Sequence, residues 1–144
     1  MIYLDSNYIV RCYLREKGSE EVLQLVQNST GLSCSLHGKL EVISTFHRHY
    51  REKKITSASF QKVTHLFLED EVKGVWNFFP LNLSLIQNAC NAVLSLPPSV
   101  FCRSADALHL VSASEHGFKK IYSHDRHLLD SAPYFGLEGV DILN

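Results

Sequence analysis

Three aspartates stand at points where the sequence pattern changes from strand to helix. Asp5 directly follows the apolar run Ile2–Leu4, and Asp125 follows a second apolar run that ends near Ser123. Asp106 lies in the first turn of a segment with the composition of a helix. In a parallel sheet, the carboxyl ends of strands and the starts of the following helices share one edge. We therefore expect these three carboxylates to converge.

A fourth acid, Glu41, lies two turns into a helix that is predicted to begin after Ser35. The predicted core face of this helix consists of Leu36, Leu40, Ile43, Phe46, His47 and Tyr50. Neighbouring helix residues are about 100° apart, so Glu41 borders this face instead of opposing it. We expect Glu41 to lean over the same edge of the sheet as the aspartates.

Four carboxylates gathered in one pocket indicate a bound cation, because like charges repel one another. Oxygen ligands alone suit Mg²⁺ or Mn²⁺, which commonly bind through a few carboxylates and substrate phosphate oxygens. Such ions make water a better nucleophile and neutralise charge on a phosphoryl group. The chemistry that fits is phosphodiester hydrolysis, with either one or two ions.

Each acid also has a purely structural explanation. An aspartate after a strand is an ordinary helix N-cap, worth about 1 kcal/mol, which applies to Asp5 and Asp125. Asp106 could complement the dipole of its helix, and Glu41 could simply be solvated. The metal site is therefore a hypothesis about the four acids taken together.

Strands and helices alternate along the chain in the manner of an α/β fold. Strands are predicted at 2–4, 32–34, 75–83, 119–123 and 137–143, and Ser84 and Ser104 are predicted to cap the helices that follow them. The lack of hairpin signals favours a mainly parallel sheet. The first strand has no polar alternate, which is typical of a central strand covered on both faces. Without a linker or repeat, residues 1–144 are predicted to form one domain.

The composition is that of an ordinary globular protein, with 45% hydrophobic and 20% charged residues among 144. No stretch has the length or hydropathy of a membrane span, and no signal segment is evident, so we expect a cytoplasmic protein without membrane contact. The four scattered cysteines fit buried thiols better than disulfides or a zinc site. A net charge of −1 argues against a high-affinity DNA binder but leaves a nuclease open.

The four acidic segments together resemble the motifs of PIN-domain ribonucleases, among which the VapC toxins of toxin–antitoxin pairs are the largest group. The segments that carry the resemblance are Leu4-Asp5-Ser6-Asn7, residues 35–41 ending in Glu41, Ser104-Ala105-Asp106-Ala107-Leu108-His109-Leu110 and Ser123-His124-Asp125. The helix with the sequence DALHL and the order D, E, D, D are its specific parts. The resemblance covers nearly the whole chain.

This resemblance implies a three-layer α/β/α fold around a central, mainly parallel sheet of four to five strands. It also implies a Mg²⁺- or Mn²⁺-dependent endoribonuclease. The catalytic and metal-binding positions would be Asp5, Glu41, Asp106 and Asp125. The small polar residues that orient the acids would be Ser6, Asn7 and Ser123.

The chain departs from the family pattern at Gly38, which weakens a helix, and at His124, beside the fourth acid. Candidate contacts to the RNA are Arg103, next to the Asp106 helix, and, more remotely, Lys39 and His124. A basic helix end, residues 48–54, could track an RNA backbone or merely complement the helix dipole.

The function we expect is therefore that of an endoribonuclease toxin with RNA as substrate, an antitoxin protein as partner and, as an open question, self-association into a homodimer. The alternative is a PIN-like module that binds RNA or protein without cutting. A phosphoryl-transfer domain of the receiver or phosphatase kind is disfavoured, because Ser6 and Asn7 supply no second acid beside Asp5.

Overall fold

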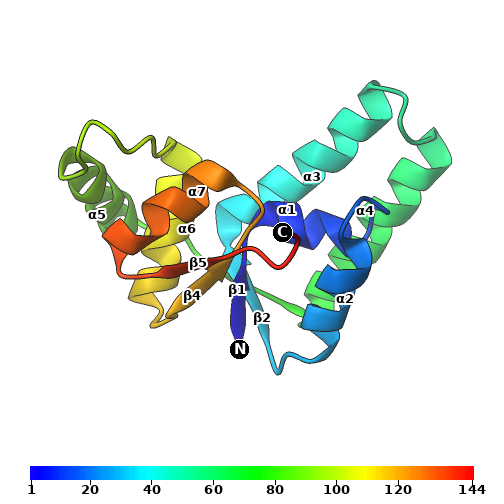
Figure 1. The fold of residues 1–144 in the computed structure, drawn as a ribbon. Helices are drawn as coiled ribbons and strands as arrows, with labels where there is room; N and C mark the ends of the chain where they lie inside the picture. The colour runs from blue at the N-terminus through cyan, green and yellow to red at the C-terminus, as the bar shows by residue number, and fades with distance from the viewer.

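A computed structural model describes residues 1–144 of the chain. Five short strands form a single parallel sheet at the centre of the molecule (Figure 1). The strands are β1 (Ile2–Leu4), β2 (Leu32–Ser35), β3 (Trp76–Phe79), β4 (Lys120–Tyr122) and β5 (Glu138–Val140). Their order across the sheet is β3-β2-β1-β4-β5, and every neighbouring pair is parallel. The predicted α/β class is confirmed, and β1 is the central strand.

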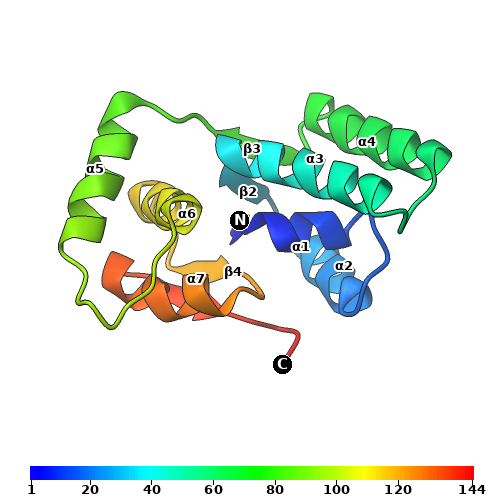
Figure 2. The same ribbon diagram turned by 90° about the horizontal axis from the view of Figure 1, so that it is seen from above.

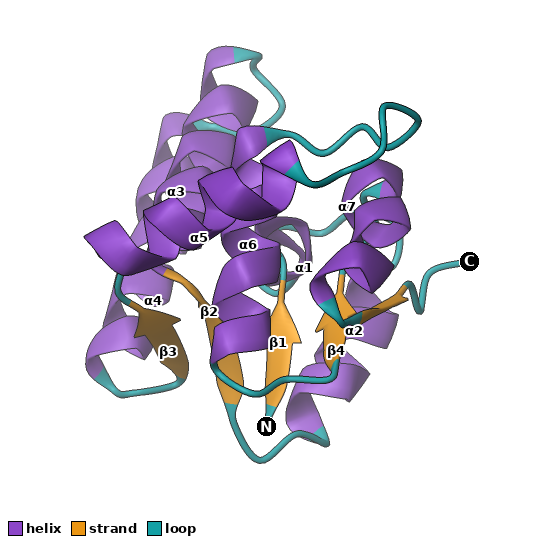
Figure 3. Cartoon of the chain, turned by 90° about the vertical axis from the view of Figure 1, so that its left-hand side faces the viewer, coloured by secondary structure: helices purple, strands orange, loops and turns teal.

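Seven α-helices cover the two faces of this sheet (Figures 2 and 3). One group is formed by α1 (Ser6–Arg11), α2 (Ser19–Gln27), α3 (Leu36–Arg51) and α4 (Ser57–Val72). The other is formed by α5 (Leu83–Leu94), α6 (Ser104–Glu115), α7 (Arg126–Ser131) and the short 3₁₀ helix η1 (Ala132–Phe135). The molecule is thus a three-layer α/β/α sandwich, as predicted.

The sheet separates two hydrophobic clusters, and β1 contributes to both. Leu4 packs into the cluster beneath α1 to α4, whereas Tyr3 packs into the cluster beneath α5, α6 and α7. Both side chains are fully buried. Because successive side chains of a strand point to opposite faces, an apolar strand with two covered faces is what the run Ile2–Leu4 requires.

The strand ends that precede the acids lie at the same edge of the sheet. Leu4 pairs with Tyr122 in the register of β1 and β4, and the Asp5 N–H donates to the Tyr122 carbonyl at 2.9 Å. Ser35 ends β2 on the other side of β1 and is followed at once by α3. The carboxyl edge of the sheet therefore receives the starts of α1, α3 and α7.

Several predicted element boundaries were wrong. The third strand ends at Phe79 instead of residue 83, because Pro80 has no N–H for the ladder and Asn82 already caps α5 by accepting from the Leu85 N–H at 2.8 Å. The predicted cap Ser84 thus lies inside α5. The cap of α6 is also one residue earlier than predicted, at Arg103.

Of the six residues predicted to form the core face of α3, only Phe46 is buried, and Leu36, Leu40, His47 and Tyr50 are exposed. The buried residues of this helix are Gly38, Val42 and Phe46, while Leu36 and Leu40 are 42% and 66% exposed. Apolar spacing alone could not show that a glycine marks the side of closest approach to the sheet. Glu41 still borders the buried face, because it precedes Val42.

None of these helices is both long enough and apolar enough to cross a membrane.

Candidate active site

All four predicted acids line one pocket at the carboxyl edge of the sheet, with a volume of about 440 Å³. They come from four elements: Asp5 from the end of β1, Glu41 from α3, Asp106 from the first turn of α6, and Asp125 from the N-cap of α7. The other residues that line the pocket are Ser6, Asn7, Arg103, Ser104 and Ala105. The fold brings together acids that are up to 120 positions apart.

Asp5 is the most enclosed acid of the pocket, with 5% of its surface exposed. One carboxylate oxygen accepts from the Ser6 N–H at 2.6 Å and from its hydroxyl at 3.3 Å. The other accepts from the Asn7 amide at 2.5 Å and from the Ser123 hydroxyl at 2.7 Å. Asp5 therefore caps α1 and is oriented by the three small polar residues predicted for that task.

Burial raises the pKa of Asp5, and this effect outweighs the opposing influence of His109 and of the Ser123 hydrogen bond. Glu41 adds to the rise, because it is a second carboxylate nearby. A carboxylate with a raised pKa gains from a nearby cation, since the cation favours its charged form.

Asp106 and Asp125 are joined by the guanidinium of Arg103. Arg103 Nε donates to Asp106 at 2.8 Å, and its terminal nitrogen Nη2 contacts both Asp106 (3.4 Å) and Asp125. Asp125 also caps α7 by accepting from the N–H groups of His127 (2.9 Å) and Leu128 (3.3 Å). Partial burial alone would raise the pKa of Asp125, but Arg103 and these N–H groups lower it on balance.

Glu41 is held from the side of the core by His109, whose Nε2 lies 2.6 Å from Glu41 Oε1. The same nitrogen lies 3.4 Å from Asp5 Oδ1. Partial burial alone would raise the pKa of Glu41, but the hydrogen bond and charge of His109 lower it on balance. Burial alone would lower the pKa of His109. Its neighbours Tyr3, Cys34 and Glu41 outweigh this effect, so the pKa of His109 lies well above the ordinary value.

A second histidine, His37, lies beside this pair, with its ring centroid 4.1 Å from that of His109. Its Nε2 is 3.1 Å from the Ala105 carbonyl, and its Nδ1 is 2.6 Å from Ser35 Oγ. A carbonyl can only accept, so Nε2 carries the hydrogen and Nδ1 accepts from the hydroxyl. Burial and the neighbouring His109 lower the pKa of His37 to about 4, which agrees with a neutral ring.

The nearest potential ligand atoms of His37, Glu41 and His109 all lie within 4.8 Å of one another, close enough to surround an ion. However, hydrogen bonds already use both ring nitrogens of His37, so we assign this residue to bridging α3 and α6. The oxygen donors of the four acids fit Mg²⁺ or Mn²⁺ better than they fit zinc. In this conformation, the guanidinium of Arg103 lies between two of those acids.

Two of the predicted RNA contacts lie outside the lining of the pocket. Lys39 is paired with Glu71 of α4 at 2.7 Å, and His124 Nδ1 is 2.9 Å from Asp141 near the C-terminus. Only the backbone N–H of His124 approaches the site, where it donates to Asn7. Of the three predicted contacts, the structure brings Arg103 alone to the acids.

The sequence reasoning missed His109 and His37. Both carry a spacing signal, because His109 is three residues after Asp106 and His37 is four residues before Glu41. Residues three or four apart lie on the same face of a helix. A search for histidines at these offsets from each acid would have found both.

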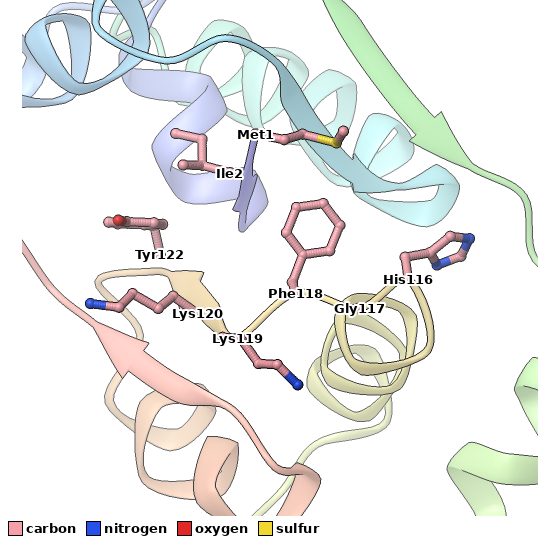
Figure 4. A pocket seen from close by; sticks show the side chains of 8 residues that line it. All are labelled: Met1, Ile2, His116, Gly117, Phe118, Lys119, Lys120 and Tyr122. Carbon is pink, nitrogen blue, oxygen red and sulfur yellow. The ribbon is translucent and has the colours of Figure 1, made fainter.

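A different pocket, at the opposite edge of the sheet, has no carboxylate in its lining (Figure 4). It has a volume of about 420 Å³ and is bordered by apolar and basic side chains, among them Phe118, Lys119 and Lys120. This pocket therefore offers no carboxylate ligand for a metal ion.

Comparisons with known proteins concern the fold and the family of the chain. No curated protein matches the chain. Among solved structures, VapC20 of Mycobacterium tuberculosis, described as a sarcin-ricin loop cleaving toxin, is similar with a TM-score of 0.72 and 11% sequence identity. That similarity covers 96% of this chain and 99% of VapC20, and at this identity it concerns the fold alone.

The PIN domain family matches residues 2–132, a range that contains all four acids, the sheet up to β4 and the helices up to α7. The family resemblance predicted from the acidic motifs is thereby confirmed. This chain belongs to the PIN domain family.

Proposed function

We propose that this protein is a Mg²⁺- or Mn²⁺-dependent endoribonuclease. The observation that carries the proposal is the convergence of Asp5, Glu41, Asp106 and Asp125 on one pocket at the carboxyl edge of the sheet. Membership of the PIN domain family supports the same activity. When bound there, the ion would make water more acidic and neutralise charge on the phosphoryl oxygens.

The residues of the chain would prepare the site in three ways. Asp5 is held by donors on both oxygens, so its orientation is set before an ion arrives. Asp106 and Glu41 approach from α6 and α3 and would complete the set of ligands. Asp125, which is bound to its own helix by two N–H groups, would hold the ion or a water next to it.

Arg103 would change partners during this process. Its guanidinium now compensates the charges of Asp106 and Asp125. A cation would take over that compensation, and the guanidinium, with 45% of its side chain exposed, could then turn to an RNA phosphate. This proposal explains why a basic residue lies inside a pocket for a cation.

We further propose that the protein acts as the toxin of a toxin–antitoxin pair. Its fold is similar to that of a solved VapC toxin along nearly the full length of both chains. Expression of the protein should arrest bacterial growth, and co-expression of its genomic neighbour should restore it. If the chain cleaves RNA in vitro but its expression does not slow bacterial growth, the toxin role is contradicted and the proposed nuclease activity is not.

The enzymatic proposal is tested by incubating the purified chain with labelled RNA in Mg²⁺, Mn²⁺ or EDTA. We expect cleavage with either ion and none in EDTA, and a loss of at least about 100-fold in Asp5→Asn and Asp106→Asn, because each removes a charged ligand. Asp130→Asn is the matched control, since Asp130 is exposed on α7 and pairs only with Arg126. Metal-dependent cleavage that persists in both pocket variants would refute the proposed site.

A second candidate function is a PIN-like module that binds RNA or a protein without cutting. The contact of Arg103 with Asp106 and Asp125 favours it, because the guanidinium stabilises these acids without any metal. Titration with Mn²⁺, followed by electron paramagnetic resonance, separates the two candidates. Uptake of Mn²⁺ that Asp5→Asn abolishes supports the nuclease, and a folded chain that takes up none at millimolar concentration supports the module.

A further inference from the structure

His109 is the buried polar group that the proposed reaction leaves unexplained. It lies on α6 one turn after Asp106 and is only 1% exposed. A buried imidazole loses its hydration, so it is retained only where both ring nitrogens find partners. In this structure both nitrogens have partners, and these partners come from two other elements, β1 and α3.

The Nε2 edge of the ring faces two acids of the pocket. It lies 2.6 Å from Glu41 Oε1 and 3.4 Å from Asp5 Oδ1. These carboxylates belong to α3 and to the end of β1, which have no covalent connection near the site. This nitrogen therefore makes a hydrogen bond to Glu41 and lies close to Asp5, two acids that arrive from separate parts of the chain.

The Nδ1 edge of the ring faces the hydroxyl of Tyr3, at 3.0 Å. That hydroxyl accepts from the Ser35 N–H at 2.9 Å, so its own hydrogen is available for Nδ1. With Nδ1 as acceptor, the hydrogen of a neutral ring lies on Nε2 and points toward Glu41. A charged ring has a hydrogen on Nε2 as well, so the donor to Glu41 is present in either state.

The close approach of α3 to His109 depends on Gly38. A Cβ atom at this position would lie 3.1 Å from His109 Cε1 and 2.4 Å from Cys34 Sγ. Only a residue without a side chain lets α3 come near enough for Glu41 to reach His109. The glycine that looked like a departure from the family pattern thus serves the contact between these two residues.

We propose that His109 is a positioning residue of the metal site, which through its Nε2–H holds Glu41 next to Asp5 for the ion. The inference rests on the proposed metal-dependent function and adds to it a residue that would touch neither ion nor RNA. Partners that orient metal ligands typically change metal affinity by about 10–100-fold when they are removed.

The test compares His109→Leu, which removes the donor at similar volume, with His109→Gln, whose amide can replace Nε2–H. We expect Mn²⁺ affinity, measured by calorimetry on the full chain, to fall about 10–100-fold in His109→Leu and to recover largely in His109→Gln. The Mn²⁺ concentration needed for half-maximal RNA cleavage should rise by the same factor. Tyr3→Phe keeps the imidazole of His109 but removes the hydroxyl that orients it, so this change should give a smaller loss of Mn²⁺ affinity.

The control is His116→Leu, because His116 lies at the end of the same helix, stacked on Phe79 and away from the acids. Three outcomes would overturn the inference. They are a Mn²⁺ affinity of His109→Leu equal to that of the wild type, an equal loss of Mn²⁺ affinity in His116→Leu, and no recovery of Mn²⁺ affinity in His109→Gln. If His109→Leu does not fold, the Mn²⁺ affinities of His109→Gln and Tyr3→Phe decide. The inference is overturned if Tyr3→Phe binds Mn²⁺ as tightly as the wild type while His109→Gln binds it weakly. A wild-type chain that binds Mn²⁺ and cleaves RNA keeps the proposed function even when the role of His109 fails, whereas a wild-type chain that does neither refutes both.

Discussion

At the scale of single residues, the acids of the pocket have two roles at once. Asp5 and Asp125 were each predicted either to cap a helix or to bind a metal. Both accept backbone N–H groups as caps, and both also line the acidic pocket. The two explanations are compatible, because a carboxylate has two oxygens and about four sites for hydrogen bonds.

Arg103 provides the sharpest prediction at this scale. Because its guanidinium competes with a cation for Asp106 and Asp125, Arg103→Ala should raise Mn²⁺ affinity several-fold. The same change should weaken RNA binding and raise KM, because a phosphate contact is lost. Metal titration and steady-state cleavage kinetics measure the two effects, with the exposed Arg126→Ala as control. Weaker Mn²⁺ binding in Arg103→Ala would contradict the competition.

At the scale of the elements, the position of α3 decides whether Glu41 belongs to the site. Its buried face was predicted around Leu40, yet Leu40 is exposed and Gly38 lies against Cys34 and His109. The apolar pattern favoured the bulky residues, whereas the packing requires the smallest one. A glycine inside a helix normally costs about 1 kcal/mol relative to alanine, so its presence needs a reason of this kind.

Gly38→Ala should therefore destabilise the protein despite the better helix propensity of alanine. We expect a loss of about 1–3 kcal/mol in the free energy of unfolding, because the new Cβ would lie 2.4 Å from Cys34 Sγ. Urea unfolding measures the loss, and Cys34→Ala in the same chain should recover most of it. A Gly38→Ala variant that is more stable than the wild type would show that α3 can move away without cost.

At the scale of the whole molecule, the C-terminal segment closes the fold over α1. The Tyr8 hydroxyl donates to Asp141 at 3.0 Å and accepts from the Ile142 N–H at 3.0 Å. Asp141 also accepts from the Leu143 N–H at 2.9 Å and contacts His124, which follows β4. One carboxylate thus connects the last residues with the first helix and with the loop that carries Asp125.

This arrangement predicts a pH-dependent contribution to stability. Burial alone would raise the pKa of Asp141, but the hydrogen bonds from Leu143, His124 and Tyr8 lower it on balance. A lowered pKa in the folded state stabilises the protein above the unfolded pKa of about 4, and the contribution is lost as pH falls through the folded value. Asp141→Asn should therefore unfold in less urea than the wild type at pH 7. The difference should shrink in strong acid, and a constant difference would contradict the assignment.

Much of the fold was predictable from local pattern. The central strand, the order of the five strands along the chain and the position of the three aspartates at a strand end or helix start all follow from short-range rules. These rules concern hydrogen bonds and side-chain spacing within a few residues, which the sequence displays directly. Element boundaries near Pro80 and Asn82 were predicted wrongly, because a capping side chain and a missing N–H act on the same short segment.

The sequence by itself determined that Asp5 and Asp125 would meet at the carboxyl edge of a parallel sheet, since strand direction brings the ends of β1 and β4 there. Only the tertiary structure decided how the four acids of the pocket are held. The hydrogen bond of His109 to Glu41 joins residues 68 positions apart, and the contact of Arg103 with Asp125 joins residues 22 positions apart. Such contacts depend on how closely α3, α6 and α7 pack around the sheet. No local pattern of residues records that distance.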